Sequence, residues 1–121
     1  MPSGHDNLRI ESIISEIGSG IQSFSAFRSY EIVDITQATV KIKIYVRQDT
    51  YVQVYANILK NKLNLAFVQG AERIYGEDSE GGVLHVHPFN DPVGHFICET
   101  AISIEAFLSK VQEFLELEGL I

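Results

Sequence analysis

Residues 40–58 read VKIKIYVRQDTYVQVYANI, and their alternation of apolar and polar side chains decides the fold. The apolar side chains on both halves of this stretch carry even numbers, so they share one face of a sheet whenever the halves pair. A three-residue loop, Gln48-Asp49-Thr50, satisfies this condition and predicts Arg47 opposite Tyr51 and Lys43 opposite Tyr55. The stretch therefore predicts a hairpin with one apolar face and one polar face.

The alternation continues downstream, where the apolar residues carry odd numbers instead of even ones. A two-residue loop at Lys60-Asn61 accommodates this change of parity. Gly70-Ala71 fits a type II′ turn, which places Ile74 opposite Phe67 and leaves Arg73 and Tyr75 on the polar side. The remaining residues that we expect to face the core are Leu63, Leu65, Leu84, Val86, Phe96 and Cys98.

Both ends of the chain carry apolar residues at helical spacing. The first stripe predicts a helix over about 6–18, capped by Asp6 or Asn7 and ended by Gly18. The second predicts a helix over about 103–117, capped by Ser103. The stripes consist of Ile10, Ile13, Ile14 and Ile17, and of Ile104, Phe107, Leu108, Val111 and Leu115.

These elements predict one α+β domain over 1–121, with a sheet over about 22–99 and residues 1–5 flexible. The sheet is an antiparallel, meander-like sheet of about five to seven strands. Both terminal helices pack on its apolar face, so its other face is open.

Composition limits the function classes. The single cysteine, Cys98, excludes an internal disulfide and suits a reducing compartment. Neither a signal peptide nor a membrane-spanning run is visible, which predicts a cytoplasmic protein without a membrane partner. The net charge of −7 argues against nucleic acid as a partner, but the basic residues concentrate between 39 and 70 and the glutamates after 98.

The predicted open face collects basic, aromatic and histidine side chains. His85 and His87 alternate on one strand, and a reversal at 90–94 can bring His95 to the same face. The whole set consists of Lys41, Lys43, Tyr45, Arg47, Tyr51, Tyr55, Arg73, Tyr75, His85, His87 and His95.

Four interpretations of this face are open. The histidines could act as acid and base in the cleavage of single-stranded RNA, with Arg73 or Lys43 stabilising charge on phosphorus and the lysines and tyrosines binding the strand. His85, His87 and His95 could instead bind zinc, completed by Asp78, Asp91 or Glu99. The face could form a homodimer or another protein interface, as a non-catalytic binding module. Finally, these could be ordinary surface residues of a sheet.

The order of elements and the segment from Arg73 to His95 resemble a family of small prokaryotic proteins, the TumE-like toxin components of toxin–antitoxin systems. Arg73-Ile74-Tyr75-Gly76-Glu77-Asp78 and His85-Val86-His87-Pro88-Phe89 carry the resemblance. It implies that Asp78 matches an aspartate of the family, that His85, His87 and His95 match its histidines, and that the activity is directed at RNA. It also implies an antitoxin protein that covers the open face.

Overall fold

The computed structural model describes residues 9–80, 83–89, 96–98 and 103–121, with only the backbone for 96–98. The elements are α1 (Ile10–Ser23), β1 (Ser29–Ile35), β2 (Thr39–Arg47), β3 (Thr50–Asn57), β4 (Lys62–Gln69), β5 (Glu72–Glu80), β6 (Val83–His87), β7 (Phe96–Cys98) and α2 (Ile104–Leu117). The sheet is an antiparallel meander whose strand order is the order of the chain. Six strands of five to nine residues form it, and the three-residue β7 extends it beyond β6. The predicted α+β class is confirmed.

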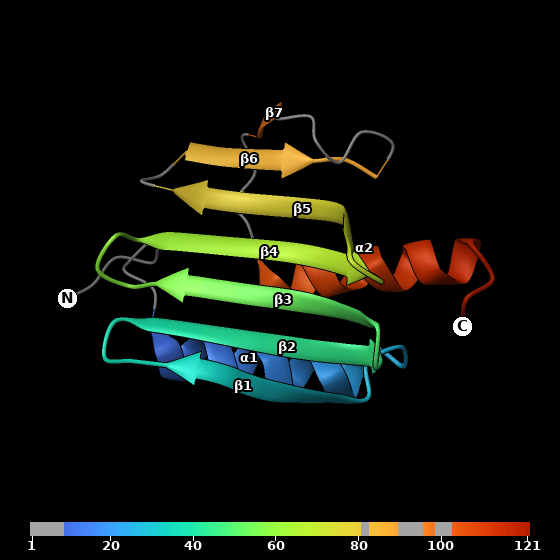
Figure 1. Cartoon of the computed structure of the whole chain (residues 1–121), viewed down its shortest axis with the longest axis horizontal. Helices are drawn as coiled ribbons and strands as arrows, with labels where there is room; N and C mark the ends of the chain where they lie inside the picture. The colour runs from blue at the N-terminus through green and yellow to red at the C-terminus, as the bar shows by residue number, and fades with distance from the viewer. Residues whose placement is uncertain (1–8, 81–82, 90–95, 99–102) are drawn as a thin grey trace.

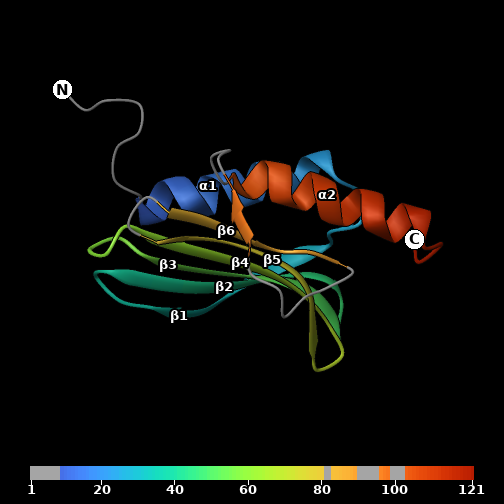
Figure 2. The same ribbon diagram turned by 90° about the horizontal axis from the view of Figure 1, so that it is seen from above.

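The molecule has two layers (Figures 1 and 2). Both helices lie on the same face of the sheet, where α1 contacts β2 and α2 contacts β4 and α1. The core lies between these layers, and the even-numbered apolar residues of β2 and β3 are almost fully buried in it. Neither of the two helices in the described residues lies over the other face of the sheet (Figure 2), as the sequence predicts.

The C-terminal helix agrees with the prediction, but the N-terminal helix differs at both ends. The Oγ of Ser103 accepts a hydrogen bond from the Ala106 N–H (3.2 Å), so the predicted cap is present. Helix α1 instead begins after Arg9, without a side-chain cap, and continues through Gly18 to Ser23. Packing overrides the glycine stop, because Gly20 is buried against Leu108 of α2. No helix in the described ranges is long and apolar enough to cross a membrane.

The residues of β2, β3 and β4 that share a face were predicted correctly, but the registers of the β2–β3 and β3–β4 pairings were not. Tyr51 lies opposite Tyr45 instead of Arg47, and Tyr55 lies opposite Lys41 instead of Lys43. The loop between β3 and β4 has four residues, since Asn57 pairs with Lys62. Parity follows from which face is buried, whereas a shift of two residues keeps the faces and is decided by turn geometry.

Besides the irregularity between Ile32 and Asp34 of β1, two β-bulges change the faces of predicted site residues. One lies between Tyr45 and Arg47, so that Arg47 is opposite Thr50, a buried residue of the helix side. The other inserts Ile74 between Arg73, which is opposite Val68, and Tyr75, which is opposite Phe67. Tyr75 therefore faces the core where Ile74 was expected. The turn at Gly70-Ala71 is as predicted, with Gly70 at φ 64° and Gln69 opposite Glu72.

Substitutions at two glycines of α1, Gly18 and Gly20, can test the contact between the helices. A Cβ on Gly20 would lie 2.4 Å from Leu108 Cδ1, whereas a Cβ on Gly18 would meet nothing within 4 Å. We expect Gly18→Ala to raise the free energy of unfolding by about 0.5–1 kcal/mol through helix propensity. Gly20→Ala should lower it by about 1–2 kcal/mol, because the buried Leu108 has to move. Urea unfolding of both variants checks this, and equal stabilisation by both would show that Leu108 repacks without strain.

Candidate functional site

The pairing of β5 with β6 assembles a polar cluster on the open face. Asp78 lies opposite His85, and Gly76 lies opposite His87. Arg73 precedes the Ile74 bulge and lies on the same face, because its partner Val68 continues the open-face row of β4. The structure thus brings together three residues that the sequence singled out, Arg73, Asp78 and His87, with His85 beside them.

The imidazole of His87 lies between a carboxylate and a guanidinium. Its Nε2 lies 3.1 Å from Asp78 Oδ2, and its Nδ1 lies 3.4 Å from Arg73 Nη2. A guanidinium has only donors, so Nδ1 is the acceptor and the proton of the neutral imidazole is on Nε2, where it is donated to the carboxylate. The side chain of His87 is only 9% exposed and that of Asp78 is 29% exposed. A carboxylate that fixes the tautomer of a shielded imidazole is an arrangement suited to proton transfer.

Gly76 makes room for this cluster. A Cβ at this position would lie 3.4 Å from Arg73 Cδ, 3.5 Å from His87 Cδ2 and 3.3 Å from the Leu65 carbonyl oxygen. A side chain larger than a methyl group would therefore separate the guanidinium from the imidazole. The glycine allows the two groups to approach each other across β5.

Two hollows adjoin the cluster, and Asp78 lines both. The first, of about 340 Å³, crosses four strands and is lined by Lys41, Gln53, Tyr55, Asn64, Ala66, Arg73 and Asp78. The second, of about 350 Å³, is lined by Asp78, Glu80, Val83 and His85. Within the described part of the chain, the buried Oδ1 of Asn64 has no hydrogen-bond partner. Gln53 and Asn64 were not among the predicted site residues, although both occupy polar-face positions of their strands.

Tyr45, Tyr51 and Lys43 form a second group on the open face, closer to β1. The Tyr45 hydroxyl donates to Glu31 (2.9 Å), and this hydrogen bond, with partial burial and the charge of Glu31, raises the pKa of Tyr45. Lys43 Nζ lies 4.6 Å from the centre of the Tyr51 ring, and the two tyrosine rings lie 5.9 Å apart. These residues are on the predicted face, with both rings engaged by neighbours.

Tyr75 was wrongly assigned to the open face. It is buried on the helix side, where its ring stacks on Phe89 at 4.4 Å between centroids, and Phe89 stacks in turn on Phe114 of α2. Its hydroxyl donates to Glu77, which also binds Lys110 Nζ of α2 at 2.6 Å. The Ile74 bulge moves this tyrosine into the core, where it joins β5 to α2.

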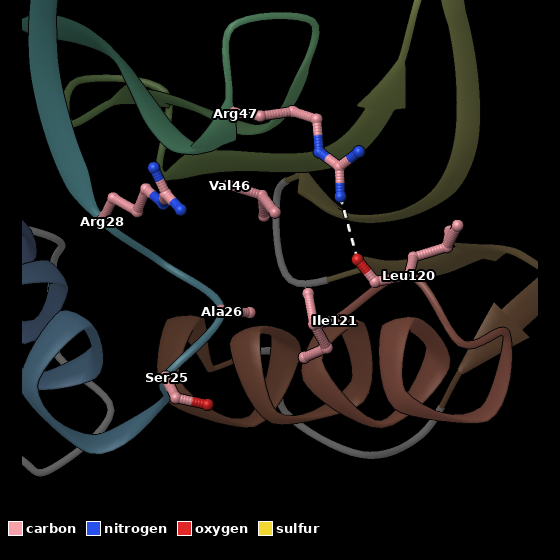
Figure 3. A pocket seen from close by; sticks show the side chains of 7 residues that line it. All are labelled: Ser25, Ala26, Arg28, Val46, Arg47, Leu120 and Ile121. Atoms are coloured by element: carbon pink, nitrogen blue, oxygen red, sulfur yellow. Dashed lines mark hydrogen bonds between the residues drawn. The ribbon is translucent and has the colours of Figure 1, made fainter.

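Arg47 was also wrongly assigned to the open face. Its Nη2 donates to the Leu120 carbonyl oxygen (2.9 Å) beyond the end of α2. Together with Arg28 it lines a hollow of about 340 Å³ at this end of the molecule, whose other lining residues are Ser25, Ala26, Val46, Leu120 and Ile121 (Figure 3). The bulge at Val46 removes Arg47 from the surface that carries the histidines.

The Tyr75 network predicts a loss of stability at alkaline pH. Burial, then the hydrogen bond to Glu77, raises the pKa of Tyr75 to about 12. Burial lowers the pKa of Lys110, but Glu77 and Tyr75 outweigh this and raise it. Because the pKa values of Tyr75 and Lys110 are raised in the folded state, the folded protein holds these protons more tightly than the unfolded chain does. The stabilisation that this gives is fully present below about pH 10 and is lost as the pH rises towards 12. We expect Tyr75→Phe to make this fall shallower, as measured by urea midpoints at pH 9 and 11, whereas the exposed control Tyr30→Phe keeps the wild-type slope.

The third histidine of the predicted cluster, His95, lies outside the described residues, as do Asp91 and Glu99. Among the described residues, no group of three histidine, cysteine, aspartate or glutamate side chains is placed to hold a metal ion. The predicted zinc site therefore depends on ligands that are not described, and it stays a prediction.

Comparisons with known proteins identify no relative. No protein-family model matches the chain, and neither a search of curated proteins nor a search of solved structures finds a match.

Proposed function

We propose that the open face binds single-stranded RNA and cleaves it next to His87, as expected of a TumE-like toxin component. The observation that carries this proposal is the contact of one imidazole with both a carboxylate and a guanidinium beside an open hollow. Such a cluster supplies a base, a group that orients it and a cation for phosphate. The antitoxin and the cytoplasmic location stay predictions of the family resemblance and the composition.

The proposed reaction uses the 2′-hydroxyl of the RNA as the nucleophile. A phosphate in the hollow attracts the guanidinium of Arg73 away from His87, and Nδ1 accepts the 2′-hydroxyl proton in its place. The 2′-oxygen then bonds to phosphorus, and the bond from phosphorus to the 5′-oxygen breaks. His85, which lies opposite Asp78 on β6, donates a proton to the leaving oxygen. The products are a 2′,3′-cyclic phosphate and a 5′-hydroxyl.

The rest of the hollow supplies contacts for the strand. Lys41 offers a charge for a neighbouring phosphate, and Tyr55 offers a ring for base stacking. Gln53 and Asn64 offer amide groups to base edges or to the 2′-hydroxyl. The hollow spans β2 to β5, which suits an extended single strand that crosses the sheet.

The test uses purified protein and one labelled sequence in three forms: RNA, DNA and fully 2′-O-methylated RNA. We expect cleavage of the RNA alone, with a cyclic phosphate at the new 3′ end and no effect of EDTA. Cleavage of all three forms would contradict the 2′-hydroxyl mechanism. Inhibition by EDTA would favour the zinc interpretation of the histidines. If no form is cleaved, the catalytic proposal is wrong, and the non-catalytic binding module becomes the interpretation to test next.

A further inference from the structure

The edge strand β1 carries an uncovered apolar row. All seven of its residues are exposed. Tyr30, Ile32 and Ile35 lie opposite Ile44, Ile42 and Val40 of β2, so they point to the helix side of the sheet. They are 40–52% exposed, whereas their partners in β2 are 0–1% exposed. Helix α1 covers β2 but leaves this row open, and Val33, the extra residue between Ile32 and Asp34, is exposed as well.

The opposite side of the same strand is acidic. Glu31 lies opposite Lys43 and Asp34 lies opposite Lys41, both on the open face of the sheet. Strand β1, with the sequence SYEIVDI, contains no basic residue. A second copy of β1 would bring carboxylates next to carboxylates, which is unfavourable between neighbouring strands. Charge complementarity instead favours a strand with lysine or arginine at these positions.

We infer that β1 is a docking edge for an extended segment of another protein in which apolar and basic residues alternate. The segment adds a strand to the sheet through the backbone groups of the outer edge of β1. Its apolar side chains extend the row of Tyr30, Ile32 and Ile35, and its basic side chains lie beside Glu31 and Asp34. Strand β2 already shows this complementarity on the inner edge. The inference is independent of RNA cleavage, since β2 to β5 lie between β1 and β6, the strand that ends at His87 (Figure 1).

The test uses two labelled peptides. The first copies β2, Thr39–Arg47 (TVKIKIYVR), and the second replaces the lysines that correspond to Lys41 and Lys43 by glutamate. Fluorescence anisotropy with the full chain should give binding of the first peptide and at least tenfold weaker binding of the second. A protein with Glu31→Gln and Asp34→Asn should bind the two peptides within threefold of each other. Leu59→Ser, which removes an apolar side chain 83% exposed outside the edge, is the control and should bind as the wild type does.

Ile32→Lys provides a second readout, because it interrupts the apolar row at an exposed position and leaves the carboxylates in place. It should weaken binding of the first peptide at least tenfold without a change in the helical circular dichroism. Equal binding of both peptides by the wild type, or no binding below 1 mM, would overturn the inference. A dimer of the chain alone that Ile32→Lys abolishes would identify a second copy as the occupant and would also overturn it.

Discussion

Replacing His87 by alanine should lower RNA cleavage by about 10²–10⁴-fold, the contribution of one positioned general base. The imidazole is the group whose tautomer is set by Asp78 and whose acceptor nitrogen faces Arg73. Initial rates on labelled RNA measure the loss. Added imidazole should restore part of the rate, because a small base can occupy the space that the side chain leaves.

A structural role of His87 has to be distinguished from a chemical one, since the side chain is shielded and bonded to Asp78. His87→Gln keeps a donor for the carboxylate but has no group that takes a proton at neutral pH. It should therefore be as inactive as His87→Ala and keep a melting temperature close to that of the wild type. Lys60→Ala, in the β3–β4 loop outside the lining of the hollow, should keep the full rate. Cleavage at the wild-type rate by the His87→Gln variant would show that the imidazole takes no part in the reaction.

Lys110→Met should lower the free energy of unfolding by about 2–3 kcal/mol, the largest change in stability that we expect from a single charged residue. Glu77 is 6% exposed in its side chain and binds Lys110 Nζ at 2.6 Å. Methionine keeps the volume of the lysine stem but leaves the carboxylate buried without its cation. The expected loss is below that of a fully buried pair, because the Lys110 side chain is 50% exposed. Urea unfolding at pH 7 measures it.

The companion variant Glu77→Gln separates the buried charge from the lost contact. Lys110→Met in a Glu77→Gln background should cost less than about 1 kcal/mol, because no carboxylate is then left without a cation. The same loss in both backgrounds would show that Lys110 acts through packing of its stem alone. The double-mutant cycle therefore measures how strongly α2 is held to β5 by charge.

The faces of most site residues could be predicted from the sequence, because they follow from period-two alternation. Lys41, Tyr55 and His87 lie on the open face for this reason, whereas Asp78 lies there because the Ile74 bulge reverses the alternation after Arg73. Gln53 and Asn64 could have been found by the same rule, since they alternate with buried neighbours. The contact of Arg73 with His87 could not be predicted, because it depends on a side-chain approach across Gly76.

The sequence by itself determined the α+β class, the antiparallel order of the strands and the C-terminal helix with its Ser103 cap, because each depends on local periodicity or on a local hydrogen bond. Tertiary structure alone decided the two bulges that moved Tyr75 and Arg47 to the helix side. It also decided the continuation of α1 past Gly18, where Gly20 packs against Leu108. Alternation specifies which residues share a face only while the ladder is regular. Where the ladder is interrupted, packing against the helices selects which side chain is buried.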